Sequence, residues 1–157
     1  MICKYKASED AVEKVRKNSK KGKENIEKLE KSKNKHYVET TKGGGSLRPD
    51  SIKNAMNGKG TGSTTNFNPD GQSGFYGESV LAHELQHAAD SDTCQIDPSD
   101  KNKNGYPDYE DDAVDAGNDY RDGVGENRRD DYGDLNPDPN KRTPPKPGDS
   151  CKCKRGS

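Results

Sequence analysis

Residues 79–89 constrain the fold of this chain most strongly, because they combine a helical apolar pattern with two closely spaced histidines. His83 and His87 are four residues apart, and 3.6 residues per turn would place both imidazoles on one face of a helix. Val80, Leu81, Leu85 and Ala88 would then cover the rest of that helix. The chain has 3 histidines in all, so two of them fall in this one motif.

The motif is His-Glu-x-x-His, a spacing in which both histidines can bind one cation. Glu84 would lie one step around the helix, where it can hold and deprotonate a water without binding the metal itself. The alternative is an ordinary surface helix that carries two histidines. The apolar window and the turn residues before it favour the metal site.

Composition limits the core that the rest of the chain can form. Apolar residues make up 24% of the 157 residues and charged residues 35%, whereas globular domains usually have about 45–50% apolar residues. We therefore predict a small, loop-rich α+β domain in which a bound metal adds stability. The core candidates are Val80, Leu81, Leu85, Ala88, Phe67, Phe75, Tyr76, Ile52, Tyr37, Val38, Val114 and Tyr132.

The charges are unevenly distributed, although the net charge is −1. Lysines crowd residues 13–35 and aspartates dominate residues 90–138. A solvated helix face explains the basic stretch better than a phosphate-binding arm does, so we expect neither a nucleic acid nor a membrane as partner. No apolar run has the length of a membrane span or a signal peptide. Cys3, Cys94, Cys151 and Cys153 are compatible with disulfides or with free thiols.

Local patterns predict the main elements. We expect a helix over residues 8–31 that is divided at Gly22, a strand over 36–41 and a short strand over 64–67. The metal helix should begin near residue 78 and a second, acidic helix should cover 110–122. The predicted sheet, or hairpin, would lie beside the metal helix, and residues 137–157 should form an extended tail.

Zinc in a catalytic site has three protein ligands and one open position. His36 lies far upstream of the motif, so the third ligand should be acidic. The candidates are Glu110, Asp111, Asp115, Asp119 and Glu126.

Several segments together resemble a family, the zinc metallopeptidase domains of NleD-type effectors and of C-terminal toxins on RHS-repeat proteins. They are residues 43–50 (GGGSLRPD), residues 57–63 (NGKGTGS), the His-Glu-x-x-His motif, and a tail with Glu110, Ala113-Val114, Asn118, Arg121, Arg129 and Tyr132. Each piece is short, but their order is specific. The chain departs from the family at Gly117, where the family has Glu.

The resemblance implies a zincin-like fold, Zn²⁺ as cofactor and Glu110 as third ligand. The resemblance covers roughly residues 38–135. With the composition of the ends, it predicts three parts: a lysine-rich helical arm (1–35), a zinc metallopeptidase domain (36–136) and a Pro/Lys/Cys tail (137–157). Glu84 would be the general base, and Tyr132 or Arg129 would stabilise the oxyanion.

The loop before Glu110 has a second cation pattern. Oxygen side chains occupy positions 1, 3, 5, 9 and 12, with Gly105 at position 6, which is the arrangement of a calcium loop. The predicted Ca²⁺ ligands are Asp100, Asn102, Asn104, Asp108 and Asp111. The alternative is a polar turn that binds nothing, because no pair of helices of EF-hand type flanks it.

Two functions fit these observations. The first is a zinc endopeptidase, a bacterial toxin or effector domain that is secreted or delivered into a target cell and hydrolyses a protein there. It would be a monomer, have a target-cell protein as substrate and an immunity protein as inhibitor, and rely on a longer polypeptide or a secretion apparatus for delivery. The second is a non-catalytic metal- or calcium-binding structural or interaction module. Glu84 favours the first, because a structural metal site has no use for a proton acceptor beside an open position.

Overall fold

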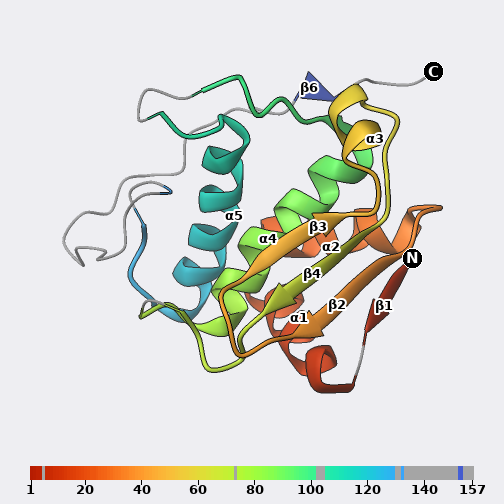
Figure 1. Cartoon of the computed structure of the whole chain (residues 1–157). Coiled ribbons are helices and arrows are strands. Elements are labelled where there is room, and N and C mark those ends of the chain that lie inside the picture. Colours follow the sequence, from red (N-terminus) through yellow and green to blue (C-terminus); the bar gives the residue numbers. More distant parts are fainter. Residues whose placement is uncertain (5, 73, 102–104, 130–131, 133–151, 154–157) are drawn as a thin grey trace.

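The computed structural model describes residues 1–4, 6–72, 74–101, 105–129, 132 and 152–153. Figure 1 shows the helices and strands that these residues form. In chain order they are β1 (Ile2–Lys4), α1 (Lys6–Asn18), α2 (Lys20–Lys31), β2 (His36–Thr40), β3 (Ser46–Pro49), α3 (Ile52–Asn57), β4 (Ser63–Phe67), α4 (Gly77–Thr93), β5 (Cys94–Gln95), α5 (Tyr109–Val124) and β6 (Lys152–Cys153).

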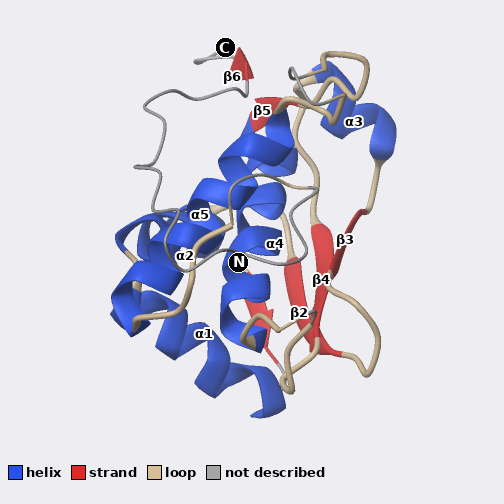
Figure 2. Ribbon diagram, turned by 90° about the vertical axis from the view of Figure 1, so that its left-hand side faces the viewer, coloured by secondary structure: helices blue, strands red, loops and turns tan. Residues whose placement is uncertain are grey.

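The main sheet has the strand order β1-β2-β4-β3. β1, β2 and β4 are parallel, and β3 runs antiparallel to β4 along one edge, with Leu47 opposite Thr65. The helices α1, α2, α4 and α5 lie on one side of this sheet, and α3 lies beyond the end of β3 (Figure 2). β5 and β6 form a separate short pair. The prediction of a small, loop-rich α+β fold is confirmed.

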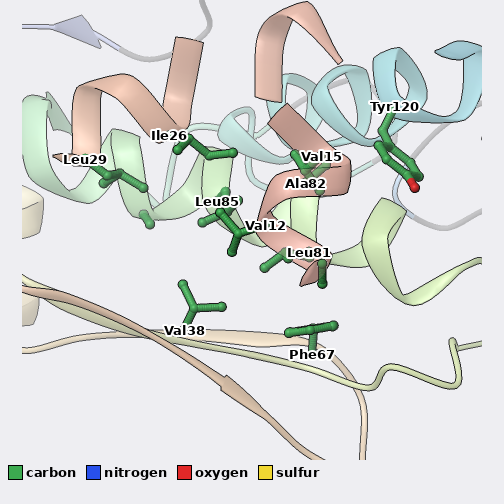
Figure 3. Packing of buried hydrophobic residues seen from close by; sticks show 12 residues of the cluster. Val12, Val15, Ile26, Leu29, Val38, Phe67, Leu81, Ala82, Leu85 and Tyr120 are labelled. Carbon is green, nitrogen blue, oxygen red and sulfur yellow. The ribbon is translucent and has the colours of Figure 1, made fainter. Parts of the chain in front are cut away.

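The helix α4 lies at the centre of the molecule. It packs against β4, α5, α1 and α2, and most of its residues are buried. Leu81 and Leu85 meet Val38 and Phe67 of the sheet on one side and the first two helices on the other (Figure 3). The rest of this cluster is made of Ala11, Val12, Val15, Ile26, Leu29, Ala82, Ala88 and Tyr120. A chain with few apolar residues thus concentrates them around one helix.

The prediction that Gly22 divides the N-terminal helix was wrong. The break is at Ser19, which has an extended backbone and caps α2 by accepting a hydrogen bond from the Gly22 amide at 2.8 Å. Asp119 of α5 accepts from the Ser19 hydroxyl at 2.7 Å and fixes this corner. Gly22 instead allows close packing, because a Cβ atom there would lie 2.5 Å from Val15 Cγ1.

Three of the predicted core residues lie on the surface. Ile52 is 66% exposed, Tyr76 56% and Tyr132 37%. Ile52 was expected in the core because apolar residues are few, but it is the first residue of α3 and faces outward there.

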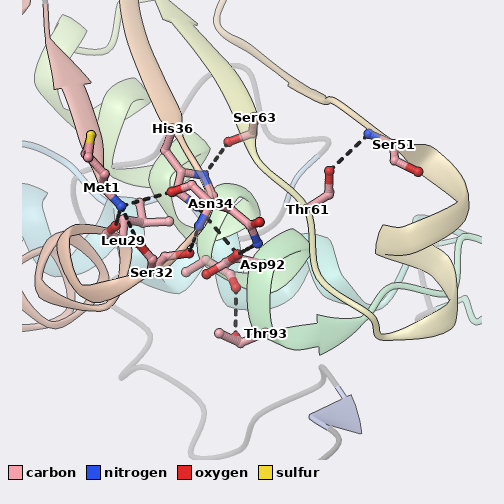
Figure 4. A network of polar contacts seen from close by, with 11 residues as sticks. Met1, Leu29, Ser32, Asn34, His36, Ser51, Thr61, Ser63, Asp92 and Thr93 are labelled. Atoms are coloured by element: carbon pink, nitrogen blue, oxygen red, sulfur yellow. Dashed lines mark hydrogen bonds and ion pairs between the residues drawn. The ribbon is translucent and has the colours of Figure 1, made fainter.

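A buried polar network joins the end of α4 to the sheet (Figure 4). His36 Nδ1 lies 2.9 Å from Ser63 Oγ, and Asn34 Nδ2 donates to Asp92 Oδ1 at 2.6 Å. The Met1 ammonium group donates to the Leu29 carbonyl at 2.7 Å in the same region. His36 is therefore part of the internal polar structure and does not belong to the group that the other two histidines form with Glu110.

None of the helices in the described ranges has both the length and the apolar character needed to cross a bilayer. Residues 137–151 and 154–157, most of the predicted tail, lie outside the described residues.

We expect Gly22→Ala to lower the free energy of unfolding by about 1–3 kcal/mol, the usual cost of overpacking a tight contact. Alanine is otherwise the better helix former, so propensity alone predicts the opposite sign. Urea denaturation followed by circular dichroism measures the difference. Glu24→Ala, at an exposed position of the same helix, is the control and should change stability little. An unchanged or raised stability in Gly22→Ala would show that α1 and α2 do not pack as described.

Candidate metal centre

His83 and His87 lie one turn apart on α4 and are both buried, at 5% and 8% exposure. Their ring planes are nearly perpendicular, at 83°, with centroids 4.8 Å apart. Their Nε2 atoms lie 3.2 Å from each other. Two imidazole nitrogens therefore converge on one point beside the helix, which is what the four-residue spacing predicts.

Glu110 supplies a third atom to the same point. It lies in the first turn of α5, and its Oε2 is 3.2 Å from His83 Nε2 and 3.0 Å from His87 Nε2. These three residues form the one group of metal-binding side chains of this kind among the described residues. The helix pair α4 and α5 thus brings together side chains that are more than twenty positions apart in the sequence.

The three atoms fit a metal ion better than they fit a set of hydrogen bonds. Ligands of a tetrahedral zinc about 2.0–2.1 Å from each atom are separated by roughly 3.3 Å, and the separations here are 3.0–3.2 Å. Each Nε2 atom can carry one proton at most and an ionised carboxylate oxygen carries none, so the three close pairs share at most two protons and one pair is left without a hydrogen bond. The buried His83/His87/Glu110 group can therefore hold a metal ion.

Burial and close partners shift the charges in this group. Burial raises the pKa of carboxyl groups, but the hydrogen bonds from His83 and His87 outweigh it and bring the pKa of Glu110 down to about 2. Burial brings the pKa of His83 down to about 4 despite its hydrogen bond to Glu110. Burial acts to lower the pKa of His87 too, but the hydrogen bond and the charge of Glu110 outweigh it and raise that pKa. Glu110 and His83 are thus in the forms in which these side chains bind metal, whereas His87 would lose a proton on binding.

Glu84 occupies the position next to the cluster without joining it. Its side chain is 8% exposed, and burial raises the pKa of this carboxyl to about 7. It lines both cavities that open on the cluster. A carboxyl group in this environment exchanges its proton near neutral pH, as a general base must.

Tyr132 and Arg129 lie on one wall of the site. The Tyr132 ring stacks on His83 with centroids 5.9 Å apart and planes at 26°, and the Arg129 guanidinium lies 5.6 Å from the Tyr132 ring centroid. Asn118 holds this segment in place, since its side chain donates to the Arg129 carbonyl at 2.8 Å and accepts from the Arg129 amide at 2.8 Å. The oxyanion role of Tyr132 and Arg129 stays a prediction.

The other acidic candidates have different contacts. Glu126 accepts a hydrogen bond from the Tyr76 amide at 2.7 Å at the start of α4, and Asp119 caps α2. Neither belongs to the histidine group. Gly117, where the resembling family has Glu, faces α4: a Cβ atom there would lie 3.2 Å from the Ser79 carbonyl oxygen. A larger side chain at that position would separate the two helices that form the site.

The calcium loop stays a prediction, because Asn102 and Asn104 lie outside the described residues. Of the described part, the Asp108 amide donates to the Asp100 carbonyl at 2.9 Å, which closes the loop at its base. Asp108 is the N-cap residue of α5 but makes no side-chain capping bond. Asp111 lies in the first turn of the same helix.

Sequence reasoning missed Gly45 as part of the site. A Cβ atom there would lie 2.3 Å from Val80 Cγ1 and 3.2 Å from Glu84 Oε1, so the backbone just before β3 passes close to the Glu84 carboxylate. The Gly45 amide donates to Gln72 Oε1 at 2.9 Å. Three consecutive glycines were visible as a turn signal, but only the fold shows which one faces Glu84.

Comparison of the chain with protein-family models, with curated proteins and with solved structures finds no match. Function must therefore be argued from the site itself.

We expect Gly45→Ala to disturb the site without unfolding the protein, because the added methyl group would press on Val80 and on the Glu84 carboxylate. The matched control is Gly43→Ala, whose Cβ atom would have only an ordinary contact, 3.7 Å from Thr41 Oγ1. Metal affinity should be similar in both variants, since neither residue contacts the histidines. Crystal structures of the two variants would show the displacement. An unmoved Glu84 in Gly45→Ala would contradict the close approach.

Proposed function

We propose that this chain is a zinc-dependent endopeptidase. The observation that carries the proposal is the placement of Glu84, which lies beside the three converging ligand atoms and lines both cavities that meet there. Zinc is the metal that two histidines and one glutamate with an open fourth position suit best. It supplies Lewis-acid polarisation of a carbonyl group and makes water more acidic.

The side chains of the protein perform the remaining chemistry. His83, His87 and Glu110 hold the ion, and Glu84 accepts a proton from the attacking water and gives it to the leaving amine. Tyr132, whose ring stacks on His83, would donate a hydrogen bond to the developing oxyanion. β3 is an edge strand with one neighbour in the described sheet, so an extended peptide can pair with its outer side.

A toxin or effector role rests on the resemblance of residues 43–50, 57–63 and 110–132 to the NleD-type and RHS-associated domains. In that role the protein acts as a monomer after secretion or delivery into a target cell, its substrate is a target-cell protein, and an immunity protein protects the producing cell. Asn118, Arg121 and Arg129, three of the positions that carry the resemblance, are joined by hydrogen bonds through the Asn118 side chain. This supports the resemblance, because the three positions stabilise one part of the site together.

Glu84→Gln separates catalysis from metal binding. We expect the variant to keep one zinc per chain, because Glu84 is not among the converging atoms, and to lose proteolysis by at least about 100-fold, because a general base contributes 10²–10⁴-fold. Mass spectrometry of a peptide mixture before and after incubation measures the loss, and elemental analysis measures the zinc.

Glu110→Ala should lose the metal itself, whereas Glu126→Ala should retain it, since Glu126 contacts Tyr76 instead. Full activity in zinc-loaded Glu84→Gln would reject the peptidase mechanism. It would leave the non-catalytic metal-binding module as the better explanation.

The effector role has its own test. Expression of the chain inside a target cell should arrest growth, and the zinc-retaining Glu84→Gln protein should be harmless at equal abundance. Colony counts after induction measure the effect. Equal toxicity of the two proteins would separate toxicity from proteolysis and remove the support for an enzymatic toxin.

A further inference from the structure

Two cavities meet at the cluster and have different walls. Both are lined by Gly45, His83, Glu84 and Tyr132. One extends toward the start of α4 and has a volume of about 290 Å³. The other extends along β3 toward α3 and has a volume of about 340 Å³.

The cavity beside α3 is predominantly apolar at its far end. Its apolar lining comes from β3, from α3 and from the segment after β5, and consists of Leu47, Pro49, Ile52, Ala55, Met56, Ile96 and Pro98. Ile52 is 66% exposed and Met56 44% exposed. Two exposed apolar side chains one turn apart on α3, at the border of a group that can hold a metal ion, indicate a ligand-binding surface.

The opposite cavity does not share this character. Its walls include Gln72 and the guanidinium groups of Arg121 and Arg129. Arg121 lies over the Phe75 ring, 4.3 Å from its centroid, so the apolar ring in this wall is largely covered by a cation. Val80, Tyr106 and Tyr132 also line this cavity, but the larger set of aliphatic side chains lies on the α3 side of the cluster, which favours an apolar ligand side chain there.

The direction of β3 relates the two sides to the direction of a bound peptide. β3 begins at the Gln72 and Arg129 cavity, where Gly45 passes Glu84, and it ends at Pro49 beside α3. A peptide paired antiparallel to β3, the more stable arrangement, runs the opposite way. Its N-terminal part then lies at the apolar cavity and its C-terminal part lies at the cavity with the arginines.

We infer that the cavity formed by Leu47, Ile52, Met56 and Ile96 binds a large apolar side chain of the substrate, on the residue immediately N-terminal to the cleaved bond. His87 and Glu110 line the same cavity, so the side chain in it belongs to a residue adjacent to the reacting carbonyl. The inference rests on the proposed peptidase function, because it names the ligand as a substrate. The preference of the cavity for an apolar side chain can nevertheless be measured without catalysis.

The direct test uses amino-acid hydroxamates, in which a zinc-binding hydroxamate group replaces the carboxyl group of the amino acid. N-acetyl-leucine hydroxamate places its side chain on the N-terminal side of the metal, and N-acetyl-glycine hydroxamate lacks that side chain. Isothermal titration of both compounds into the zinc-loaded protein should give about 10- to 100-fold tighter binding of the leucine compound.

Met56→Lys should reduce this ratio to near one, while the affinity for the glycine compound stays the same. Val124→Lys is the matched control: Val124 is also exposed, at 37%, and does not line either cavity. It should preserve the ratio. Equal affinities of the two compounds for the unmodified protein, or equal effects of Met56→Lys and Val124→Lys, would overturn the inference.

Cleavage of a proteome-derived peptide mixture tests the orientation. Leucine, methionine, phenylalanine and isoleucine should be enriched immediately before the cut, and Met56→Lys should weaken that enrichment. Enrichment only after the cut would overturn the assigned direction. A leucine-selective hydroxamate site in a protein that cuts no peptide would instead overturn the peptidase function and leave the apolar site in place.

Discussion

The burial of α4 on almost every side is the constraint on which the rest of the structure depends. A chain with 24% apolar residues cannot form two separate cores, so the sheet, the first two helices and α5 all pack on this one helix. The residues that stabilise the fold and the histidines that can hold a metal ion consequently alternate along α4. Leu81 and Leu85 face the core, while His83 and His87 face the cleft.

Placing polar groups on a core helix requires partners for them. Burial of an unpaired charge costs several kcal/mol in real proteins, and the chain meets this cost with local networks. Gln86 donates to Asp90 at 2.9 Å and accepts from Asn25 of α2 at 2.8 Å. Asn118 Oδ1 likewise accepts hydrogen bonds from the Arg121 guanidinium and from the Arg129 amide. These networks join helices that the few apolar contacts alone would position loosely.

The sequence predicted those parts of the fold that have a strong local signal. The strands at 36–40 and 63–67, the metal helix and the acidic helix all appear within a few residues of the expected limits. β1, β3 and α3 were missed, because strands of three or four residues and a six-residue helix have almost no periodicity of their own. Their positions depend on pairing with β2 and β4, which is tertiary information. The misplaced break at Gly22 has the same origin, since glycine signals both a turn and a close contact.

At the candidate site, the sequence indicated the two histidines and a short set of acids, among which the structure places Glu110 beside both rings. It did not indicate the walls. Gly45, Gln72 and Met56 come from three separate segments, and no spacing rule relates them to His83. Their arrangement follows from the edge position of β3 and from the bridge between Gln72 and Phe75, which exchange backbone hydrogen bonds at 3.0 and 2.8 Å.

The exposure of Ile52 and Met56 has a consequence for how this protein can change over time. Neither residue belongs to the main hydrophobic cluster, and substitutions on exposed positions usually shift stability by less than about 0.5 kcal/mol. The α3 segment can therefore accept new side chains while α4, α5 and the three converging ligand atoms stay as they are. Related chains that share this arrangement could diverge in what they bind at this edge without first acquiring stabilising mutations elsewhere.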